Sequence, residues 1–255
     1  MDLKELQRNW HAFGNDDPLW SILTQEELKG NKWNIEDFFN TGKKTIQHIF
    51  EYLHRLNVRV QYGLALDFGC GVGRLSQPLA LKFERVCGVD IAASMLDLAV
   101  RYNQYPDRCT YYLNTVNNLS QFEDEQFDFI LSLLVLQHMK PEYAKNYIKE
   151  FVRILKPGGI LFFQLPTSFV YPGESMQKWN LMQKIKSKLK RWGRNIRQEI
   201  IPYPGPSSPI MEMYGTPEEE MITFLNTLDM EILDIMTDQR QAMQWNNNQY
   251  ILKKG

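Results

Sequence analysis

The sequence lacks the marks of several protein classes. It holds three cysteines, Cys70, Cys87 and Cys109, with no CxxC pair, so we expect neither a disulfide framework nor a zinc or other metal site. No apolar run approaches the roughly 18 residues of a membrane span. The N-terminal segment MDLKELQRNW has no apolar signal-peptide core. These absences lead us to expect a soluble cytoplasmic protein.

The chain also lacks an excess of charge of either sign. Lys and Arg number 29 against 30 Asp and Glu, a net charge of −1, which argues against a globally basic nucleic-acid binder, and no nucleic-acid partner is expected. A hydrophobic content of 44% with 23% charged residues excludes disorder across the whole chain. A length of 255 residues predicts one large domain, alone or with a modest appendage.

Short apolar strands alternate with helices of ten to fifteen residues over much of the chain, which predicts a doubly wound α/β sheet. The expected strands are Gly63–Phe68, Arg85–Val89, Thr110–Leu113, Phe127–Leu134, Ile160–Leu165, Glu231–Met236 and Gln249–Lys253. The expected helices are Arg74–Lys82, Ala93–Asn103, Pro141–Leu155 and Pro217–Leu228, the last with Thr216 as its N-cap.

Changes in the alternation of expected strands and helices divide the chain into four parts. Residues 1–58 are expected to form an N-terminal helical cap, with apolar helical spacing from Ile46 after a break at Thr41-Gly42. Residues 59–165 form a cofactor-binding core, residues 166–214 an insertion after the fifth strand, and residues 215–255 complete the core sheet.

A glycine-rich turn, Asp67-Phe68-Gly69-Cys70-Gly71-Val72-Gly73, follows the first strand and opens a helix. Glycines allow a sharp turn and a close approach of a ligand to the main chain, and a helix N-terminus offers unpaired N–H groups. Asp90 ends the second strand, where a carboxylate can accept both hydroxyls of a ribose. Strand, loop, helix, strand and acid in this order favour a nucleotide site over a simple tight turn.

The loop departs from the dinucleotide fingerprint G-x-G-x-x-G/A. The third small residue of the fingerprint would fall at Arg74, which is large and charged. Asp67 precedes the first glycine by two residues. A carboxylate is unfavourable beside a pyrophosphate and useful beside an ammonium group. The loop therefore favours a ligand with a ribose and a cationic amino-acid tail, and a dinucleotide-dependent oxidoreductase is the alternative.

The sequence resembles S-adenosylmethionine-dependent methyltransferases of the Rossmann-like class (class I) through the stretches LALDFGCGVGRLS, VCGVDIAASMLDLA, FDFILSLLVLQHM and ILKPGGILFF. With the alternation of elements, we expect a seven-stranded, mostly parallel sheet whose last strand is antiparallel, an N-terminal helical layer and a helical insertion after the fifth strand. The flanking stretches DPLWSILT, WNIEDFFNTG and MEMYGTPEE resemble a bacterial subgroup associated with glycan or secondary-metabolite pathways.

The resemblance implies roles for individual residues. Asp67 and the loop glycines would hold the methionine end of S-adenosylmethionine, and Asp90 the ribose. Ile91 would pack on the adenine, and Thr115 with the Val116 backbone would recognise its edge. The full set expected to bind the cofactor is Phe39, Thr41, Asp67, Gly69, Cys70, Gly71, Gly73, Arg74, Asp90, Ile91, Thr115, Val116 and Leu133.

Methyl transfer requires few catalytic groups because a sulfonium already carries a good leaving group; alignment and exclusion of water do most of the rest. A hydroxyl acceptor also needs a base. His138, after the fourth strand, is the candidate, with packing under the cofactor or a loop hydrogen bond as alternatives. Glu212 and Tyr214 are candidate substrate contacts. We expect a small-molecule or glycan acceptor, methylated at oxygen, with S-adenosylhomocysteine as the second product.

The insertion carries a basic amphipathic stretch, Met176–Ile201, with eight Lys and Arg residues against Glu199. Its apolar residues recur at helical spacing. A cap over the active site is the favoured interpretation, and peripheral contact with an anionic membrane is the alternative. A methyltransferase-like scaffold that docks on a membrane through this stretch is the non-enzymatic alternative.

Overall fold

The computed structural model describes residues 1–169, 209–238 and 245–255. The basic stretch at 176–201, and with it the choice between an active-site cap and a membrane contact, lies outside the described residues.

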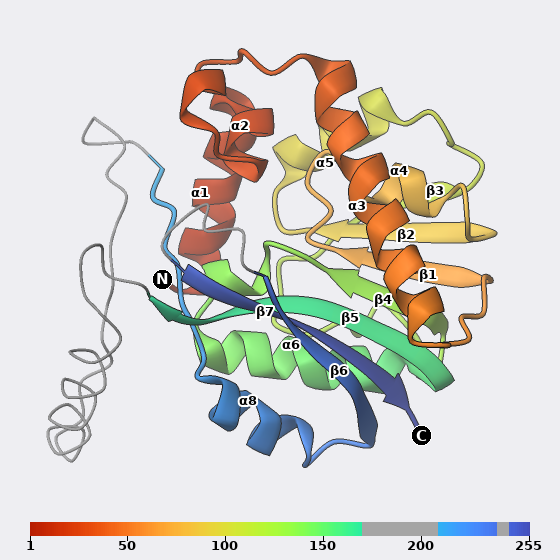
Figure 1. Cartoon of the computed structure of the whole chain (residues 1–255). Coiled ribbons are helices and arrows are strands. Elements are labelled where there is room, and N and C mark those ends of the chain that lie inside the picture. Colours follow the sequence, from red (N-terminus) through yellow and green to blue (C-terminus); the bar gives the residue numbers. More distant parts are fainter. Residues whose placement is uncertain (170–208, 239–244) are drawn as a thin grey trace, which may run out of the picture.

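A seven-stranded sheet in the order β3-β2-β1-β4-β5-β7-β6 forms the centre of the protein (Figure 1). Strands β1 to β5 pair in parallel, and β7 runs antiparallel to both β5 and β6. This confirms the predicted doubly wound α/β sheet with an antiparallel last strand. The strands are β1 (Leu64–Phe68), β2 (Arg85–Asp90), β3 (Cys109–Leu113), β4 (Phe127–Ser132), β5 (Leu155–Phe169), β6 (Met230–Asp238) and β7 (Trp245–Lys254).

Helices cover both faces of the sheet. On one face, α3 (Ile35–Arg55) and α4 (Ser76–Leu79) pack on the central strands. On the other face lie α6 (Pro141–Ile154) and α8 (Glu218–Leu225). With helices on both sides, the central strands are buried on both faces, which explains why β4 is apolar and buried almost throughout.

The strand order places a crevice at the carboxyl end of β1. The chain passes from β1 to β2 on one side, and β4 lies on the other side of β1. The loops that follow β1 and β4 therefore diverge, and such a switch point is where open α/β sheets bind ligands.

The N-terminal helices lie at this end of the strands (Figure 1). They are α1 (Leu3–Asp16), α2 (Pro18–Ile22) and the start of α3, with a 3₁₀ turn, η1 (Glu26–Leu28), before α3. A reciprocal capping box between Asp2 and Glu5 begins α1. Near its end, α1 packs on α5 (Ala93–Tyr102), where a Cβ on Gly14 would lie 2.2 Å from Ser94 Oγ.

The predicted break at Thr41-Gly42 is wrong, because α3 runs without interruption through it. A Cβ on Gly42 would lie 2.1 Å from the carbonyl oxygen of Arg74. The glycine therefore lets α3 approach the turn after β1 closely. This packing requirement, and not a helix end, accounts for a glycine at this position.

Other predicted boundaries differ from the structure as well. The helix expected at Arg74–Lys82 is regular only over α4, Ser76–Leu79. Pro217, and not Thr216, occupies the N-cap of α8, which begins one residue later than expected, and the Thr216 backbone N–H donates to the Pro166 carbonyl at 2.8 Å. Strand β5 runs from Leu155 to Phe169 and is longer than the expected Ile160–Leu165, because Leu155 pairs with Phe127 of β4 and the far end pairs with β7 through a register shift after Pro166.

Candidate active site

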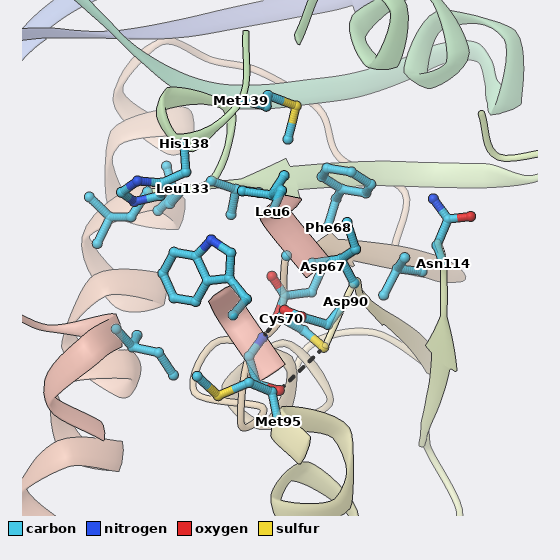
Figure 2. Close-up of a pocket in the computed structure, with 18 of the residues that line it drawn as sticks. Leu6, Asp67, Phe68, Cys70, Asp90, Met95, Asn114, Leu133, His138 and Met139 are labelled. Atoms are coloured by element: carbon cyan, nitrogen blue, oxygen red, sulfur yellow. Dashed lines mark hydrogen bonds between the residues drawn. The ribbon is translucent and has the colours of Figure 1, made fainter. Parts of the chain in front are cut away.

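A cavity with about 890 Å³ of empty space, part of it open to solvent, lies at the carboxyl end of the central strands. Its walls come from the turns after β1, β2, β3 and β4, and from the N-terminal helices. Figure 2 shows Asn114 and His138 at opposite ends of it, with Asp67 and Asp90 between them. Of the predicted site residues, the cavity is lined by Asp67, Gly69, Cys70, Gly71, Arg74, Asp90, Ile91, Leu133 and His138.

The other predicted site residues do not line this cavity. Thr115 and Val116 are exposed beyond the end of β3. Phe39 is half-buried and makes an edge contact with Tyr102, with ring centroids 5.8 Å apart. The full set outside the lining is Phe39, Thr41, Gly73, Thr115, Val116, Glu212 and Tyr214.

The glycine loop folds as its sequence requires. Gly69, Gly71 and Gly73 have φ angles of 76°, 54° and 83°, in the left-handed region that favours glycine. At Gly69, an added Cβ would lie 2.2 Å from a methyl group of Val135. The loop therefore lies against the turn after β4, and the carboxyl ends of β1 and β4 form one wall.

Asp90 holds the glycine loop as well as facing the cavity. Its Oδ2 accepts the Gly71 N–H at 2.8 Å, and its Oδ1 accepts the Ala92 N–H at 2.9 Å. Burial raises the pKa of this carboxyl, and the two backbone bonds oppose that rise. Each carboxylate oxygen accepts more than one hydrogen bond, so Asp90 retains acceptor capacity for a ligand hydroxyl.

Asp67, near the end of β1, is 2% exposed. The Ser76 hydroxyl donates to its Oδ2 at 2.6 Å. Burial raises the pKa of Asp67 to about 6, although the Ser76 bond and the nearby Arg74 charge lower it. This carboxyl therefore changes its charge close to neutral pH, and a cation in the cavity would favour the ionised form.

Arg74 connects the glycine loop to α3. Its side chain is 6% exposed, and its Nη1 donates to Thr41 Oγ1 at 3.3 Å. Thr41 thus contacts the site through Arg74. The pairing of a buried guanidinium with a hydroxyl on α3 explains how the N-terminal layer is positioned over the turn after β1.

Asn114 is a cavity residue that the sequence reasoning did not select. It directly follows β3, and its Nδ2 donates to the Val116 carbonyl at 3.0 Å and to the Tyr147 hydroxyl at 3.1 Å. These two bonds fix the amide orientation and leave Oδ1 as a hydrogen-bond acceptor. Its position could have indicated a role in the site, because it directly follows a strand at the sheet edge where ligands bind.

His138 is buried in a short 3₁₀ turn, η2 (Leu136–His138), that follows β4. Its Nδ1 lies 3.0 Å from the Glu212 carbonyl oxygen. A carbonyl only accepts, so Nδ1 carries the proton, and Nε2 presents a lone pair to the Gln137 amide at 3.2 Å. Burial lowers the pKa of His138 to about 4, so its ring is neutral at physiological pH.

The N-terminal helices supply apolar cavity residues that carry no catalytic signature in the sequence. Leu3, Leu6 and Trp10 come from one face of α1, and Ile22 ends α2. Trp10 and His138 make an edge contact with centroids 5.1 Å apart. An apolar side chain facing a cavity has the same spacing as one facing a core, so periodicity alone could not separate the two.

Glu212 and Tyr214 lie beside η2. The Tyr214 N–H donates to the Gln137 carbonyl at 2.7 Å, and the Tyr214 hydroxyl donates to the Glu212 carboxylate. The Met1 ammonium donates to the Glu212 carboxylate at 2.8 Å and to the Tyr214 hydroxyl at 2.9 Å. Residues 212–214 thus position His138 through the Glu212 carbonyl and the Tyr214 N–H.

Residues 66–163 match a family model described as the methyltransferase domain. A ubiquinone biosynthesis O-methyltransferase of Coxiella burnetii is 31% identical over 147 residues, and one of Rickettsia typhi is 28% identical over 151 residues. The first match covers 55% of this chain and 62% of the relative, and the second covers 53% and 55%. The chain thus spans less than two thirds of the length of these curated relatives.

Two solved structures share the fold. Magnesium protoporphyrin IX methyltransferase from Synechocystis, with bound S-adenosylhomocysteine, has a TM-score of 0.62 at 19% identity and covers 100% of both chains. A methyltransferase from Methanosarcina mazei has a TM-score of 0.60 at 23% identity, over 80% of this chain and 96% of that one. Residues 66–163 thus match a methyltransferase domain, and the chain shares the fold of these two methyltransferases.

Two properties of the described residues bear on other functions. None of their helices combines the length and apolar character needed to cross a membrane. Within the same ranges, no three His, Cys, Asp or Glu side chains gather closely enough to hold a metal ion.

Proposed function

We propose that this protein transfers the methyl group of S-adenosylmethionine to a hydroxyl oxygen of a small-molecule or glycan acceptor. One observation carries the proposal. A single cavity joins the carboxylates of Asp67 and Asp90, beside a positive-φ glycine loop, to a buried neutral His138. The relatives named O-methyltransferases support oxygen as the acceptor atom.

The chemistry of the donor set fits the cofactor. Asp67 offers a buried carboxylate to the ammonium group, and Asp90 offers two acceptor oxygens to the ribose hydroxyls. Gly69 and Gly71 leave room that a Cβ would fill, and Asn114 presents a carbonyl oxygen at the far end, where an adenine amino group could donate. A dinucleotide fits less well, because its pyrophosphate would lie beside the buried Asp67.

When bound, S-adenosylmethionine would supply a methyl group on a sulfonium, whose sulfur would keep the electron pair of the carbon–sulfur bond as the acceptor oxygen takes the methyl group. His138 Nε2 accepts the proton that the acceptor hydroxyl loses. The Glu212 carbonyl keeps Nδ1 protonated and so directs the lone pair to Nε2. The apolar side chains of α1 exclude water from the cavity.

The flanking segments suggest further assignments. The bacterial subgroup that they resemble suggests an acceptor from a glycan or secondary-metabolite pathway. We also propose that residues 176–201 cap the active site, because in sequence they lie between β5 and residues 211–214, which contact the His138 turn. Support for both assignments comes from the sequence, and residues 176–201 lie outside the described ranges.

Binding and turnover test the proposal separately. S-adenosylhomocysteine should bind the wild type in calorimetry, and NAD should not. His138→Gln should retain S-adenosylhomocysteine affinity within about twofold and lose a hundred-fold or more of the transfer rate to a hydroxyl acceptor. Tight NAD binding without S-adenosylhomocysteine binding would overturn the cofactor assignment, and an unchanged rate in His138→Gln would overturn the role of His138.

A further inference from the structure

The end of the cavity beside His138 is walled by apolar side chains. Leu3, Leu6 and Trp10 recur at helical spacing on α1 and face the cavity. The charged residues of α1, among them Lys4 and Arg8, lie on a different, exposed face of the helix. Helix α1 therefore presents its apolar face to whatever molecule occupies this space.

The wall contributed by the turn after β4 is apolar as well. Leu133, Val135 and Met139 line it, and Figure 2 shows Leu133 and Met139 near His138. The charged lining residues, Asp67, Arg74 and Asp90, belong to the glycine-loop side. Among the described lining residues, His138 is thus the titratable group on the α1 side.

His138 can serve one hydroxyl. Its Nδ1 is committed to the Glu212 carbonyl, and its Nε2 holds one lone pair, which the Gln137 amide reaches. A sugar ring would bring several hydroxyls to this apolar end. Each buried hydroxyl without a partner lowers affinity by roughly tenfold or more. Of the two acceptor classes in the proposed function, the described walls therefore favour the small molecule over the glycan.

The acidity of the acceptor hydroxyl determines how readily His138 can take its proton. Burial lowers the pKa of His138 to about 4, so the ring has a low affinity for a proton. A phenol, with a pKa near 10, releases its proton far more readily than an alkyl hydroxyl, whose pKa is far higher and close to that of water. A weak base therefore suits a phenol or enol better than a sugar or an alkyl alcohol.

We propose that the acceptor is an uncharged, flat, largely apolar molecule whose reacting group is a phenolic or enolic hydroxyl. Its ring lies against Trp10 and the apolar face of α1, and its hydroxyl takes the place of the Gln137 amide at His138 Nε2. The proposal rests on the proposed function, because it assumes that the glycine-loop side is filled by the cofactor.

Three matched probes test the acceptor class in protein saturated with S-adenosylhomocysteine. They are 4-propylphenol, trans-4-propylcyclohexanol, which keeps size and apolarity without the acidic hydroxyl, and methyl β-glucopyranoside, which brings several hydroxyls. Calorimetry should show the phenol binding at least tenfold more tightly than the glucoside. With S-adenosylmethionine, the phenol should be methylated at least a hundred-fold faster than the cyclohexanol.

Variants connect the result to the cavity. Trp10→Ala should weaken phenol binding at least fivefold and leave S-adenosylhomocysteine affinity within twofold, and Trp10→Phe should restore most of the loss. The control is Trp33→Phe, which alters a half-buried tryptophan outside the cavity lining and should change neither affinity.

The outcomes separate this inference from the proposed function. If S-adenosylhomocysteine does not bind at all, the proposed function fails. If it binds, the inference is overturned when the glucoside binds as tightly as the phenol, when none of the three probes binds, when the cyclohexanol is methylated as fast as the phenol, or when Trp10→Ala leaves phenol affinity unchanged.

Discussion

The Glu212 carbonyl oxygen accepts a hydrogen bond from His138 Nδ1 at 3.0 Å, across 74 positions of sequence. The bond places the proton on Nδ1 and the lone pair on Nε2. It also holds residues 211–214 against the turn after β4. The chemical form of His138 therefore depends on a backbone atom from a distant segment.

Acid should destabilise the protein through His138. The folded pKa of about 4 lies below the unfolded value of 6.5, so the unfolded state binds more protons between these values, and stability falls as pH falls through this window. The contribution is on the order of 3 kcal/mol. Urea unfolding at pH 7 and pH 4 should show a smaller loss for His138→Gln than for wild type. The exposed His48→Gln should behave like wild type, and equal losses in all three proteins would contradict the prediction.

Cofactor affinity should depend on pH through Asp67. Its pKa of about 6 means that the carboxylate is protonated at lower pH and cannot pair with an ammonium group. The affinity for S-adenosylhomocysteine should therefore be constant above pH 7 and should fall up to tenfold per pH unit below 6. Calorimetry in buffers of different ionisation enthalpy should detect proton release near pH 6. Asp67→Asn should bind weakly without this pH dependence, and a flat profile in wild type would exclude Asp67 as the ammonium partner.

Replacing Asp90 should weaken cofactor binding and loosen the glycine loop together. Asp90→Ala removes the acceptor of the Gly71 and Ala92 N–H groups as well as a charge-assisted ribose contact. Affinity for S-adenosylhomocysteine should fall by about 1.5–3 kcal/mol. Asp97→Ala, at an exposed position of α5, is the matched control and should leave affinity unchanged. Full affinity in a folded Asp90→Ala protein would disprove the assignment.

Gly69→Ala should destabilise the protein more than Gly158→Ala, because only the new methyl group at position 69 would clash with a neighbouring side chain. Both glycines have positive φ, 76° and 74°, so both substitutions carry a backbone cost of roughly 1–2 kcal/mol. The Cβ at Gly69 would also lie 2.2 Å from Val135, whereas at Gly158 nothing lies within 4 Å. Thermal unfolding should show a larger loss for Gly69→Ala, with cofactor binding abolished. Equal losses and retained binding would show that the loop accommodates a methyl group.

Much of the fold could be predicted from local sequence. Strand β4 is apolar because parallel strands are buried on both faces, and the turn Gly69–Gly73 is rich in glycine because its φ angles are positive. The position of Asp90 at the end of β2 follows from the same alternation. These features depend on interactions within a few residues, or on burial common to all parallel sheets.

The misread positions depend on neighbours that are distant in sequence. Gly42 resembles a helix break until Arg74 is placed beside it. Thr216 resembles an N-cap, but α8 begins at Glu218 after Pro217, and the Thr216 N–H pairs with the distant Pro166. The sequence cannot reveal such contacts, because each joins segments separated by at least thirty residues.

By itself, the sequence determined the sheet, the glycine loop and the carboxylates beside it, because periodicity and loop composition are local consequences of burial and turn geometry. Tertiary structure alone decided which face of α1 closes the cavity and which nitrogen of His138 carries the proton. An apolar helix face looks alike over a core or a cavity, and the protonation of a histidine depends on burial and on the groups that folding brings to it.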